Sequence, residues 1–513
     1  MTSRRLFLAV FGLLAVVVGA QNLGTPRNAG PDEPAHVVRA AGLVRGEVFG
    51  TGLDELSAAE LAELDGGAAD IANADPSNSS LGLFDVPAWV RGPSEECFAM
   101  TGATGDAANY GVFPASCARH MPPADTLSSA ATYPVWSHLL PGAATLLVHN
   151  DGALWLARLF HGLVPLLLVA AALTRLLTAA RIAAASAVLV ALTPMTLFMF
   201  AVVNPSGVAI AGALALWVAL DDVLARRAAP DWLLPAAFAA LVLPRDDGVL
   251  WAALIVGVLL AVHRTAPLAA WRLLSLPARA VVAATTAASA LWALLAGGEL
   301  VPVDRPATGI EFAEIVVQRT GRHLREAIGV LGWLDTELPE SVLYLWCLAA
   351  GLVVMIALAA RQQRRALGAA AALGLGIVAG WVLEIVQGRT AGLFWQGRYA
   401  LPVLAGLVLL PGLSRGADRA VGRLGAFVPG VVAVVVWNGA FLQALRRWGV
   451  GRHGSVRPWA WDTYGAPMPV LLLIAAHVAA SAGLGYLVWR CAAGGSDDDT
   501  TPPLGLSPIR GGG

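Results

Sequence analysis

Residues 182–220 read IAAASAVLVALTPMTLFMFAVVNPSGVAIAGALALWVAL and contain no charged side chain. The stretch is rich in Leu, Ala and Val, and apolar and polar residues do not alternate in it as they do in a transmembrane barrel strand. Within a lipid bilayer, a helix satisfies its own backbone hydrogen bonds. The stretch therefore predicts two apolar helices, 182–203 and 206–220, joined by the tight turn Asn204-Pro205-Ser206.

The same apolar character extends along the whole chain. Of its 513 residues, 57% are hydrophobic and only 13% are charged, whereas a soluble domain carries about 25% charged residues. Charge this sparse cannot cover the surface of a water-soluble protein of this size, so membrane lipids are the expected surroundings. The net charge of -1 gives no reason to expect a nucleic-acid partner. The composition predicts an all-α polytopic membrane protein.

About twelve membrane-spanning helices are expected. The first is the run 6–20, which follows Arg4-Arg5 and is interpreted as an uncleaved helix with its N-terminus inside. The others are 153–173, 182–203, 206–220, 232–243, 249–262, 280–297, 341–360, 367–386, 399–413, 425–444 and 467–489. A full span needs about 20 residues. The shorter segments between 206 and 262 can therefore be tilted, broken or re-entrant, and the count can change by about two.

Arginines in the short loops predict the orientation. Cytoplasmic loops carry an excess of basic residues, and every second crossing ends at a basic loop. These loops hold Arg175 and Arg181; Arg226 and Arg227; Arg264, Arg272 and Arg279; Arg361, Arg364 and Arg365; Arg415, Arg419 and Arg423; and Arg490. We therefore expect a protein of the cell membrane with both termini in the cytoplasm.

The predicted domain organisation is a single integral membrane domain over residues 1–490. It includes a large first outer loop, 21–150, and is followed by a disordered cytoplasmic tail, 491–513, rich in Asp, Pro and Gly. Cys97 and Cys117 share the outer loop. Outside the cytoplasm they can form a disulfide, and the alternative is two unpaired thiols.

The first outer loop opens with Pro31-Asp32-Glu33-Pro34-Ala35-His36. The residues after Pro34 form an amphipathic pattern that can lie along the membrane surface. A carboxylate at that level can accept a proton from a hydroxyl nucleophile, or hold a divalent metal together with His36. The alternative is that Asp32 simply caps a helix that has proline in its first turn.

A second group of candidates consists of arginines in outer segments, where the positive-inside rule does not explain them. Arg319, Arg322 and Arg325 would share one face of a helix, and guanidinium groups suit phosphate. Pairing with Glu311, Glu314 and Glu326 is the alternative. Gln396, Arg398 and Tyr399 stand at the outer mouth of another span. Within the apolar segments, Arg158 and Glu384 can neutralise each other.

Several short motifs occur together in a recognisable order. They are Pro31-Asp32-Glu33-Pro34-Ala35-His36, Tyr133-Pro134-Val135-Trp136, Val203-Asn204-Pro205-Ser206-Gly207, Gly332-Trp333-Leu334-Asp335-Thr336-Glu337-Leu338-Pro339 and Gln396-Gly397-Arg398-Tyr399. This ordered set, over residues 1–410, resembles a bacterial family of multi-pass membrane proteins of unknown function that is usually grouped with the GT-C glycosyltransferases. Ser206 departs from the pattern, which has an acidic residue after Asn-Pro.

The resemblance implies an outward-facing enzyme that takes a sugar from a polyprenyl-phosphate donor and transfers it to a glycan or lipid acceptor. It implies a GT-C-like fold whose first outer loop carries membrane-parallel helices. Asp32 would be the general base, with Glu33 as its substitute or as a ligand of an optional divalent metal. The lipid phosphate would be held by His36, Arg319, Arg322, Arg325, Gln396, Arg398 and Tyr399. The competing functions are a transporter or flippase of a lipid-linked or polar solute, and a non-catalytic scaffold for cell-envelope assembly.

Overall fold

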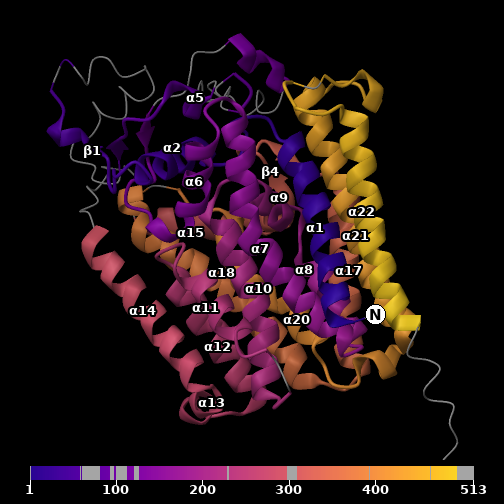
Figure 1. Cartoon of the computed structure of the whole chain (residues 1–513). Helices are drawn as coiled ribbons and strands as arrows, with labels where there is room; N and C mark the ends of the chain where they lie inside the picture. Colours follow the sequence, from indigo (N-terminus) through magenta and orange to yellow (C-terminus); the bar gives the residue numbers. More distant parts are fainter. Residues whose placement is uncertain are drawn as a thin grey trace, which may run out of the picture.

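The computed structural model describes residues 2–57, 59, 81–92, 97–99, 113–120, 126–227, 230–296, 309–391, 393–462 and 464–493. Its long helices form one bundle (Figure 1). The α-helices in the first half are α1 (Ser3–Gly24), α2 (Glu33–Leu43), α5 (Ala88–Arg91), α6 (Leu139–Leu147), α7 (Gly152–Thr178), α8 (Ile182–Ala191), α9 (Pro194–Ala201), α10 (Pro205–Leu224), α11 (Leu233–Val242) and α12 (Gly248–His263).

The remaining α-helices are α13 (Pro267–Leu273), α14 (Leu276–Ala296), α15 (Gly309–Gln318), α16 (Thr320–Gly329), α17 (Glu340–Ala359), α18 (Gln363–Ala391), α19 (Leu401–Leu404), α20 (Gly406–Gly412), α21 (Ala417–Val450) and α22 (Val470–Ala493). The 3-10 helices are η1 (Leu53–Glu55), η3 (Ala115–His120), η4 (Val135–Ser137), η5 (Gly397–Ala400) and η6 (Pro458–Ala460). Of the tail expected to be disordered, 491–493 end α22, and 494–513 lie outside the described residues.

The chain is a multi-pass membrane protein. Among its described residues, eight helices are long and apolar enough to cross a bilayer, or up to ten if each of two bent pairs, α8–α9 and α12–α13, forms one span. Twelve spans therefore stay a prediction. The difference arises in the short segments, because α11 has only 10 residues and the segment 399–413 is divided among η5, α19 and α20.

Helix α10 lies at the centre of the bundle. It is apolar on all sides until Asp221, which is typical of a helix surrounded by other helices. The most apolar 18-residue window of α10 is 94% buried, the highest share among the candidate spans. Small residues permit its close packing: a Cβ at Gly212 would come within 2.5 Å of the backbone nitrogen of Leu241 in α11. The sequence 206–220 is thus a core helix as well as a membrane span.

The predicted helix 182–203 is broken into α8 and α9, whose axes differ by 68°. Pro194 begins α9, and the hydroxyl of Thr193 caps it by accepting the backbone N–H of Thr196. The break frees backbone carbonyls inside the bundle. The indole of Trp437 donates to the carbonyl of Leu192 at 2.6 Å, and that of Trp346 donates to the carbonyl of Val190 at 3.0 Å. Neighbouring helices thus supply the missing hydrogen bonds.

The first loop and other short elements gather at one end of the bundle, at the top of Figure 1. A small antiparallel sheet joins β1 (Thr51–Gly52), β2 (Gly82–Leu83) and β3 (Leu127–Ser128), and a hairpin pairs β4 (Val330–Leu331) with β5 (Thr336–Glu337). Helices α2 and α6 have 11 and 9 residues, too few to span a bilayer. Their expected alignment with the membrane surface stays a prediction.

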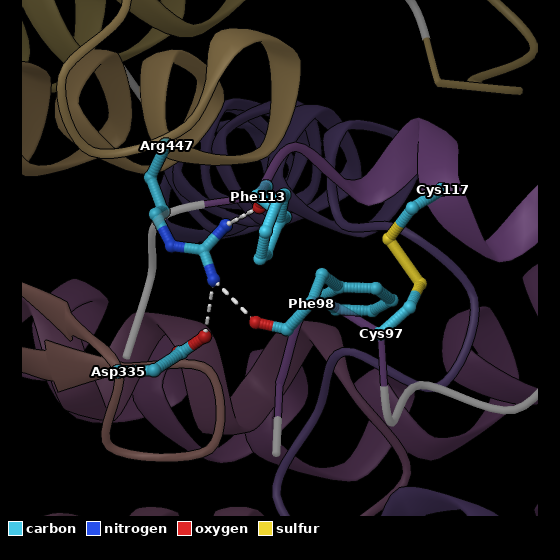
Figure 2. The surroundings of a disulfide bond; sticks show 6 residues. All are labelled: Cys97, Phe98, Phe113, Cys117, Asp335 and Arg447. Carbon is cyan, nitrogen blue, oxygen red and sulfur yellow. Dashed lines mark hydrogen bonds and ion pairs between the residues drawn. A yellow bond between two sulfur atoms is a disulfide. The ribbon is translucent and has the colours of Figure 1, made fainter. Parts of the chain in front are cut away.

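A disulfide between Cys97 and Cys117 lies at this end (Figure 2). Next to it, the guanidinium of Arg447 in α21 donates to the carbonyls of Phe98 and Phe113, and to the carboxylate of Asp335 at 2.7 Å. Arg447 and Asp335 are both buried. This ion pair fixes the first loop against the Gly332–Pro339 segment and the top of α21.

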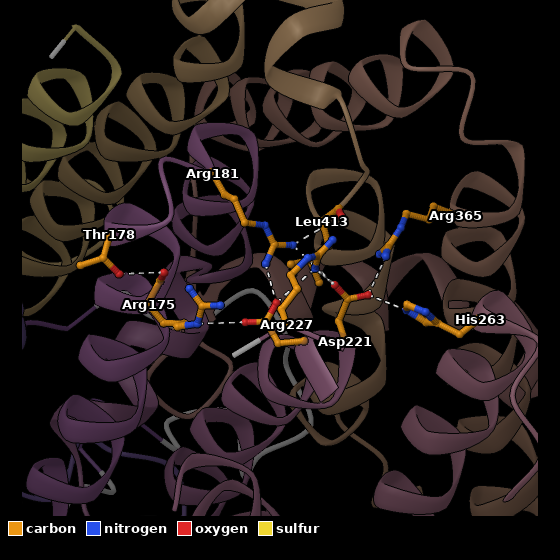
Figure 3. Close-up of polar contacts among 9 residues, drawn as sticks. Arg175, Thr178, Arg181, Asp221, Arg227, His263, Arg365 and Leu413 are labelled. Atoms are coloured by element: carbon orange, nitrogen blue, oxygen red, sulfur yellow. Dashed lines mark hydrogen bonds and ion pairs between the residues drawn. The ribbon is translucent and has the colours of Figure 1, made fainter. Parts of the chain in front are cut away.

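The opposite end of the bundle holds a cluster of charges (Figure 3). Its centre is the buried pair Asp221 and Asp222 near the end of α10. Asp221 accepts from Arg365 at 2.6 Å and from His263 at 2.8 Å. Arg175 of α7, Arg181 immediately before α8, and Arg227 in the loop after α10 surround the two carboxylates. The N-terminus and the end of α22 lie in this same half of the molecule (Figure 1). That this half faces the cytoplasm stays a prediction.

Candidate functional site

Asp32 is the carboxylate at the start of α2 that remains accessible. Its side chain is 38% exposed, and it accepts a hydrogen bond from the Arg398 guanidinium at 2.6 Å. Its backbone is left-handed (φ 59°), which is uncommon for a residue with a side chain. The carboxylate makes no capping hydrogen bond to the helix. Helix capping, the alternative considered from the sequence, therefore does not explain this residue.

Glu33 has a different environment from its neighbour. It is fully buried, and both of its oxygens bind Arg158 of α7, at 2.7 and 2.6 Å. One oxygen also accepts the backbone N–H of Val203 at 3.0 Å. The same guanidinium donates to the carbonyls of Asn22, Thr25 and Pro26. Glu33 thus holds α2 against α7 and the α9–α10 turn, and its oxygens have no room for a substrate or a metal.

This arrangement corrects the pairing expected for Arg158. Its partner is Glu33, and Glu384 instead accepts from Arg319 at 2.9 Å. Both Arg158 and Glu384 are charges in apolar helices that need a counter-charge, but the sequence does not reveal which charges meet. The correct partners come from segments between the long helices, where α2 and the α15–α16 junction fold onto the bundle.

Arg398 lies in η5, with 1% of its side chain exposed. Besides Asp32, it donates to the side chain of Gln396 and to the hydroxyl of Tyr399 at 3.3 Å. Gly397 permits η5 to pack closely against α16, because a Cβ at this position would lie 1.8 Å from the carbonyl oxygen of His323. The predicted residues Gln396, Arg398 and Tyr399 therefore meet Asp32, from which Arg398 is separated by 366 positions in the chain.

Arg245 is a site residue that the sequence reasoning missed. It lies in the turn between α11 and α12, and its guanidinium stacks on the Tyr399 ring at 4.5 Å from the centroid. It also pairs with Asp247 at 3.0 and 3.2 Å and donates to Ser206 at 3.2 Å. Burial alone would lower the pKa of Arg245, but Asp247, Tyr133 and Tyr399 together raise that pKa above its ordinary value. The available signal was an arginine in a turn that the predicted orientation places outside, where the positive-inside rule does not explain it.

His36 belongs to a buried histidine pair. Its Nδ1 lies 3.2 Å from Nε2 of His138, and its ring meets the edge of Tyr133. Burial first, then the charges of His138 and Arg245, hold the pKa of His36 well below its ordinary value. Burial and then Arg39 lower the pKa of His138 to about 3. The structure thus places His36 against His138 and not as a metal ligand beside Asp32. Among the described residues, no group of three or more His, Cys, Asp or Glu side chains could hold a metal ion.

The histidine pair predicts sensitivity to acid. In the unfolded chain, a histidine takes up a proton as the pH falls below about 6.5, whereas folded His138 stays neutral until far lower pH. Because the unfolded state then binds more protons, stability should fall by about 2 kcal/mol at pH 5 through this residue. We expect His138→Gln to have a shallower decline of the thermal midpoint between pH 7.5 and 5, measured in detergent. The exposed His149 supplies the control, His149→Gln, and equal slopes in both variants would contradict the assignment.

The group Arg319, Arg322 and Arg325 does not converge on Asp32. Each has a carboxylate partner: Glu384, Glu326 and Glu340 in that order, at 2.9, 2.9 and 2.7 Å. Arg322 and Arg325 line a separate cavity of about 560 Å³, together with Trp333, Arg447 and Arg452. Asp32 and Arg398 do not line this cavity. Of the carboxylates expected from the sequence, Glu326 does bind Arg322, whereas Arg319 and Arg325 bind Glu384 and Glu340, which were not expected.

Glu326 connects this cavity to the Asp32 site. Its Oε1 accepts from Arg322, while its Oε2 accepts the backbone N–H of Gly397 at 2.9 Å. It therefore fixes the position of η5 and, through it, of Arg398. Asp32, Arg398, Arg245 and Tyr399 together present an accessible carboxylate beside two guanidinium groups and a phenol. Such a set can accept a proton and stabilise a phosphate.

Comparison with known proteins extends these observations. A family described as "Predicted membrane protein (DUF2142)" matches residues 125–407, which is more than half of the chain. The matched region includes Arg245, Arg398 and Tyr399 but begins after Asp32. No curated protein and no solved structure matches the chain. The chain therefore belongs to the DUF2142 family of predicted membrane proteins.

Proposed function

We propose that this protein is a membrane-embedded glycosyltransferase that uses a polyprenyl-phosphate-linked sugar on the outer face of the cell membrane. The product would be a glycan or glycolipid of the cell envelope. The observation that carries the proposal is the contact between the partly exposed carboxylate of Asp32 and the buried guanidinium of Arg398. It joins, in one place, a base for a hydroxyl nucleophile and a cation for a phosphate leaving group.

The reaction needs only one displacement. The Asp32 carboxylate accepts the proton of an acceptor hydroxyl, whose oxygen forms a bond to the anomeric carbon of the donor sugar. The bond from that carbon to the phosphate oxygen breaks, and the lipid phosphate leaves with the electron pair. Attack from the face opposite the phosphate inverts the anomeric centre. Because phosphate is a stable anion, little acid assistance is required.

The arginines would supply the main electrostatic stabilisation. Arg398 already holds an anion, the Asp32 carboxylate, and donates to Gln396, while Glu326 fixes the backbone of the adjacent Gly397. Arg245 contacts the same Tyr399 ring, with its guanidinium carbon 4.5 Å from the centroid, against 4.9 Å for Arg398. Two oriented guanidinium groups suit the bidentate recognition of phosphate and need little rearrangement when charge develops on it. A divalent metal, where the reaction uses one, would bind at the Asp32 carboxylate.

Transport of a lipid-linked or polar solute is the second candidate. The broken pair α8–α9 favours it, because transporters use discontinuous helices near the membrane midplane. In this protein, however, Trp346 and Trp437 occupy the carbonyls at the break. The charged side chains of the Asp32 site instead lie at the start of α2 and at the mouths of other helices, which favours an interfacial enzyme.

The test is sugar transfer by the purified full-length protein in liposomes, with radiolabelled polyprenyl-phosphate sugars as donors and envelope lipids as acceptors. We expect wild-type protein and Asp54→Asn, an exposed aspartate of the same loop, to transfer the label, and Asp32→Asn to lose it. Movement of labelled donor across the liposome without transfer would instead indicate a flippase. If the protein neither transfers the sugar of any donor nor moves any donor across the membrane, a non-catalytic scaffold is the remaining function.

A further inference from the structure

A shallow groove of about 550 Å³ runs between α12 and α18, along the halves of these helices that hold Arg264 and Arg364. Its walls are apolar, and small residues such as Gly257, Ala261 and Ala371 keep it open. Gly257 is exposed, and a Cβ built on it meets no atom within 4 Å. Its volume lies within the range of small-molecule sites, about 300 to 1,000 Å³. Because α18 is a candidate span, the groove faces the lipid.

Two arginines line one end of the groove, Arg264 at the end of α12 and Arg364 in the first turn of α18. Both are exposed, and among the described residues neither guanidinium has an ion-pair or hydrogen-bond partner. Their chain neighbours His263 and Arg365 both bind the Oδ1 atom of Asp221 (Figure 3). This shared contact holds the two helix ends together, so Arg264 and Arg364 stand at the same level.

Helix α13 indicates where that level lies relative to the membrane. Its axis makes an angle of 97° with α12, so it runs across the bundle end if α12 crosses the bilayer. Within α13, Trp271 and Arg272 are exposed, and such residues are frequent at the membrane–water interface. Arg264 precedes α13 by only a few residues. The free guanidinium groups therefore lie where phospholipid headgroups are found, at the end of a groove suited to hydrocarbon.

We infer that this groove binds one anionic glycerophospholipid, with an acyl chain between α12 and α18 and its phosphate between Arg264 and Arg364. Charge complementarity supports this occupant, because two unpaired cations at the headgroup level adjoin an apolar channel and guanidinium binds phosphate in a fixed geometry. The site is independent of the proposed transferase reaction, which takes place at the opposite end of the molecule. The bound lipid would attach the bend between α12 and α13 to the adjacent leaflet of the membrane.

The experiment is native mass spectrometry of the full-length protein in detergent, titrated with phosphatidylglycerol or with phosphatidylcholine carrying the same acyl chains. A basic residue near the membrane surface is worth about fivefold in binding, so the arginine pair should favour phosphatidylglycerol by about thirtyfold. We expect Arg264→Gln/Arg364→Gln to lose this preference. The exposed pair Arg415 and Arg419 supplies the matched control, Arg415→Gln/Arg419→Gln, which should keep it.

A second variant tests the groove itself. Gly257→Phe should fill the channel and weaken the binding of both lipids about tenfold or more, while Gly351→Phe, at an equally open position on α17, should not. Thermal unfolding in detergent checks that both variants fold. The inference is overturned if both lipids bind the wild type equally, if Gly257→Phe binds them as the wild type does, or if inorganic phosphate alone at millimolar concentration abolishes the preference. Dimer formation that disappears in Gly257→Phe would assign the groove to a second copy and would equally overturn it.

Discussion

Among the side chains that hold the start of α2 in place, Arg158 of α7 is expected to be the most sensitive to substitution. Arg158→Met should lower the free energy of unfolding by about 3 to 5 kcal/mol. The guanidinium and the Glu33 carboxylate are both fully buried. Removing the arginine leaves a buried carboxylate without its counter-charge and three carbonyls without their donor. The measurement is the thermal midpoint in detergent, together with the fraction of monodisperse protein.

The double variant Glu33→Gln/Arg158→Met separates the ion pair from packing. It removes both charges, so it should recover part of the lost stability, because an uncompensated buried ion costs more than an absent pair. Arg325→Met is the matched control, since Arg325 and Glu340 form an ion pair that is largely exposed. Such pairs contribute little. If Arg158→Met unfolds at the temperature of Arg325→Met, Glu33 is not the structural residue of this loop.

The contrast between Asp32 and Glu33 shows where prediction from the sequence reaches its limit. Both carboxylates were predicted as site residues from the Pro31–His36 motif, and nothing in that motif distinguishes them. Which carboxylate faces the interior depends on the rotation of α2 relative to α7. The ion pair between Glu33 and Arg158 fixes this rotation. The side chain that binds Glu33 lies 125 positions away. Adjacent residues of one motif therefore have opposite exposure for a reason that only the tertiary structure contains.

Arginines were the most informative residues of the sequence, and also the most easily misassigned. Arg398 was selected because it stands at an outer helix mouth where charge is unexpected, and it does contact Asp32. Arg319, Arg322 and Arg325 were selected for the same reason, but nearby carboxylates already bind them. Arg245 was not predicted as a site residue, although it contacts Tyr399 in the same way as Arg398 does. The sequence identifies charged residues that need an explanation, but it does not reveal which of them form ion pairs with each other.

The positions of the helices could be predicted more reliably than the number of helices that cross the membrane. Apolar runs correspond to helices in the structure, because only helices satisfy the backbone in lipid. Whether a run crosses the membrane depends on its length and on bends. The bend at Pro194 could be expected from proline, but its 68° angle is made tolerable by two tryptophans from α17 and α21. The predicted count of twelve thus includes segments that the tertiary structure bends or shortens.

Asp32→Asn should lower the turnover number of sugar transfer by about 10² to 10⁴, the usual contribution of a general base. The donor KM should change little, because the amide keeps the size of the side chain and the proton transfer belongs to the transition state. Stability should fall by less than in Arg158→Met, since the Asp32 side chain is 38% exposed and the amide oxygen can still accept a hydrogen bond from Arg398. Equal turnover numbers for Asp32→Asn and the exposed control Asp54→Asn would remove Asp32 as the base.

Arg398→Lys distinguishes the base from the phosphate site in the same assay. Lysine keeps the positive charge but loses the planar fork that contacts Asp32, Gln396 and Tyr399 together. If Arg398 holds the lipid phosphate, its replacement weakens donor binding and transition-state stabilisation, so the donor KM should rise and kcat/KM should fall by about 10² or more. If Arg398 only orients Asp32, the turnover number alone should fall and the double variant Asp32→Asn/Arg398→Lys should be no worse than Asp32→Asn. A further loss of kcat/KM in the double variant would therefore assign Arg398 to the phosphate, because two groups that act on different atoms of the reaction add their effects.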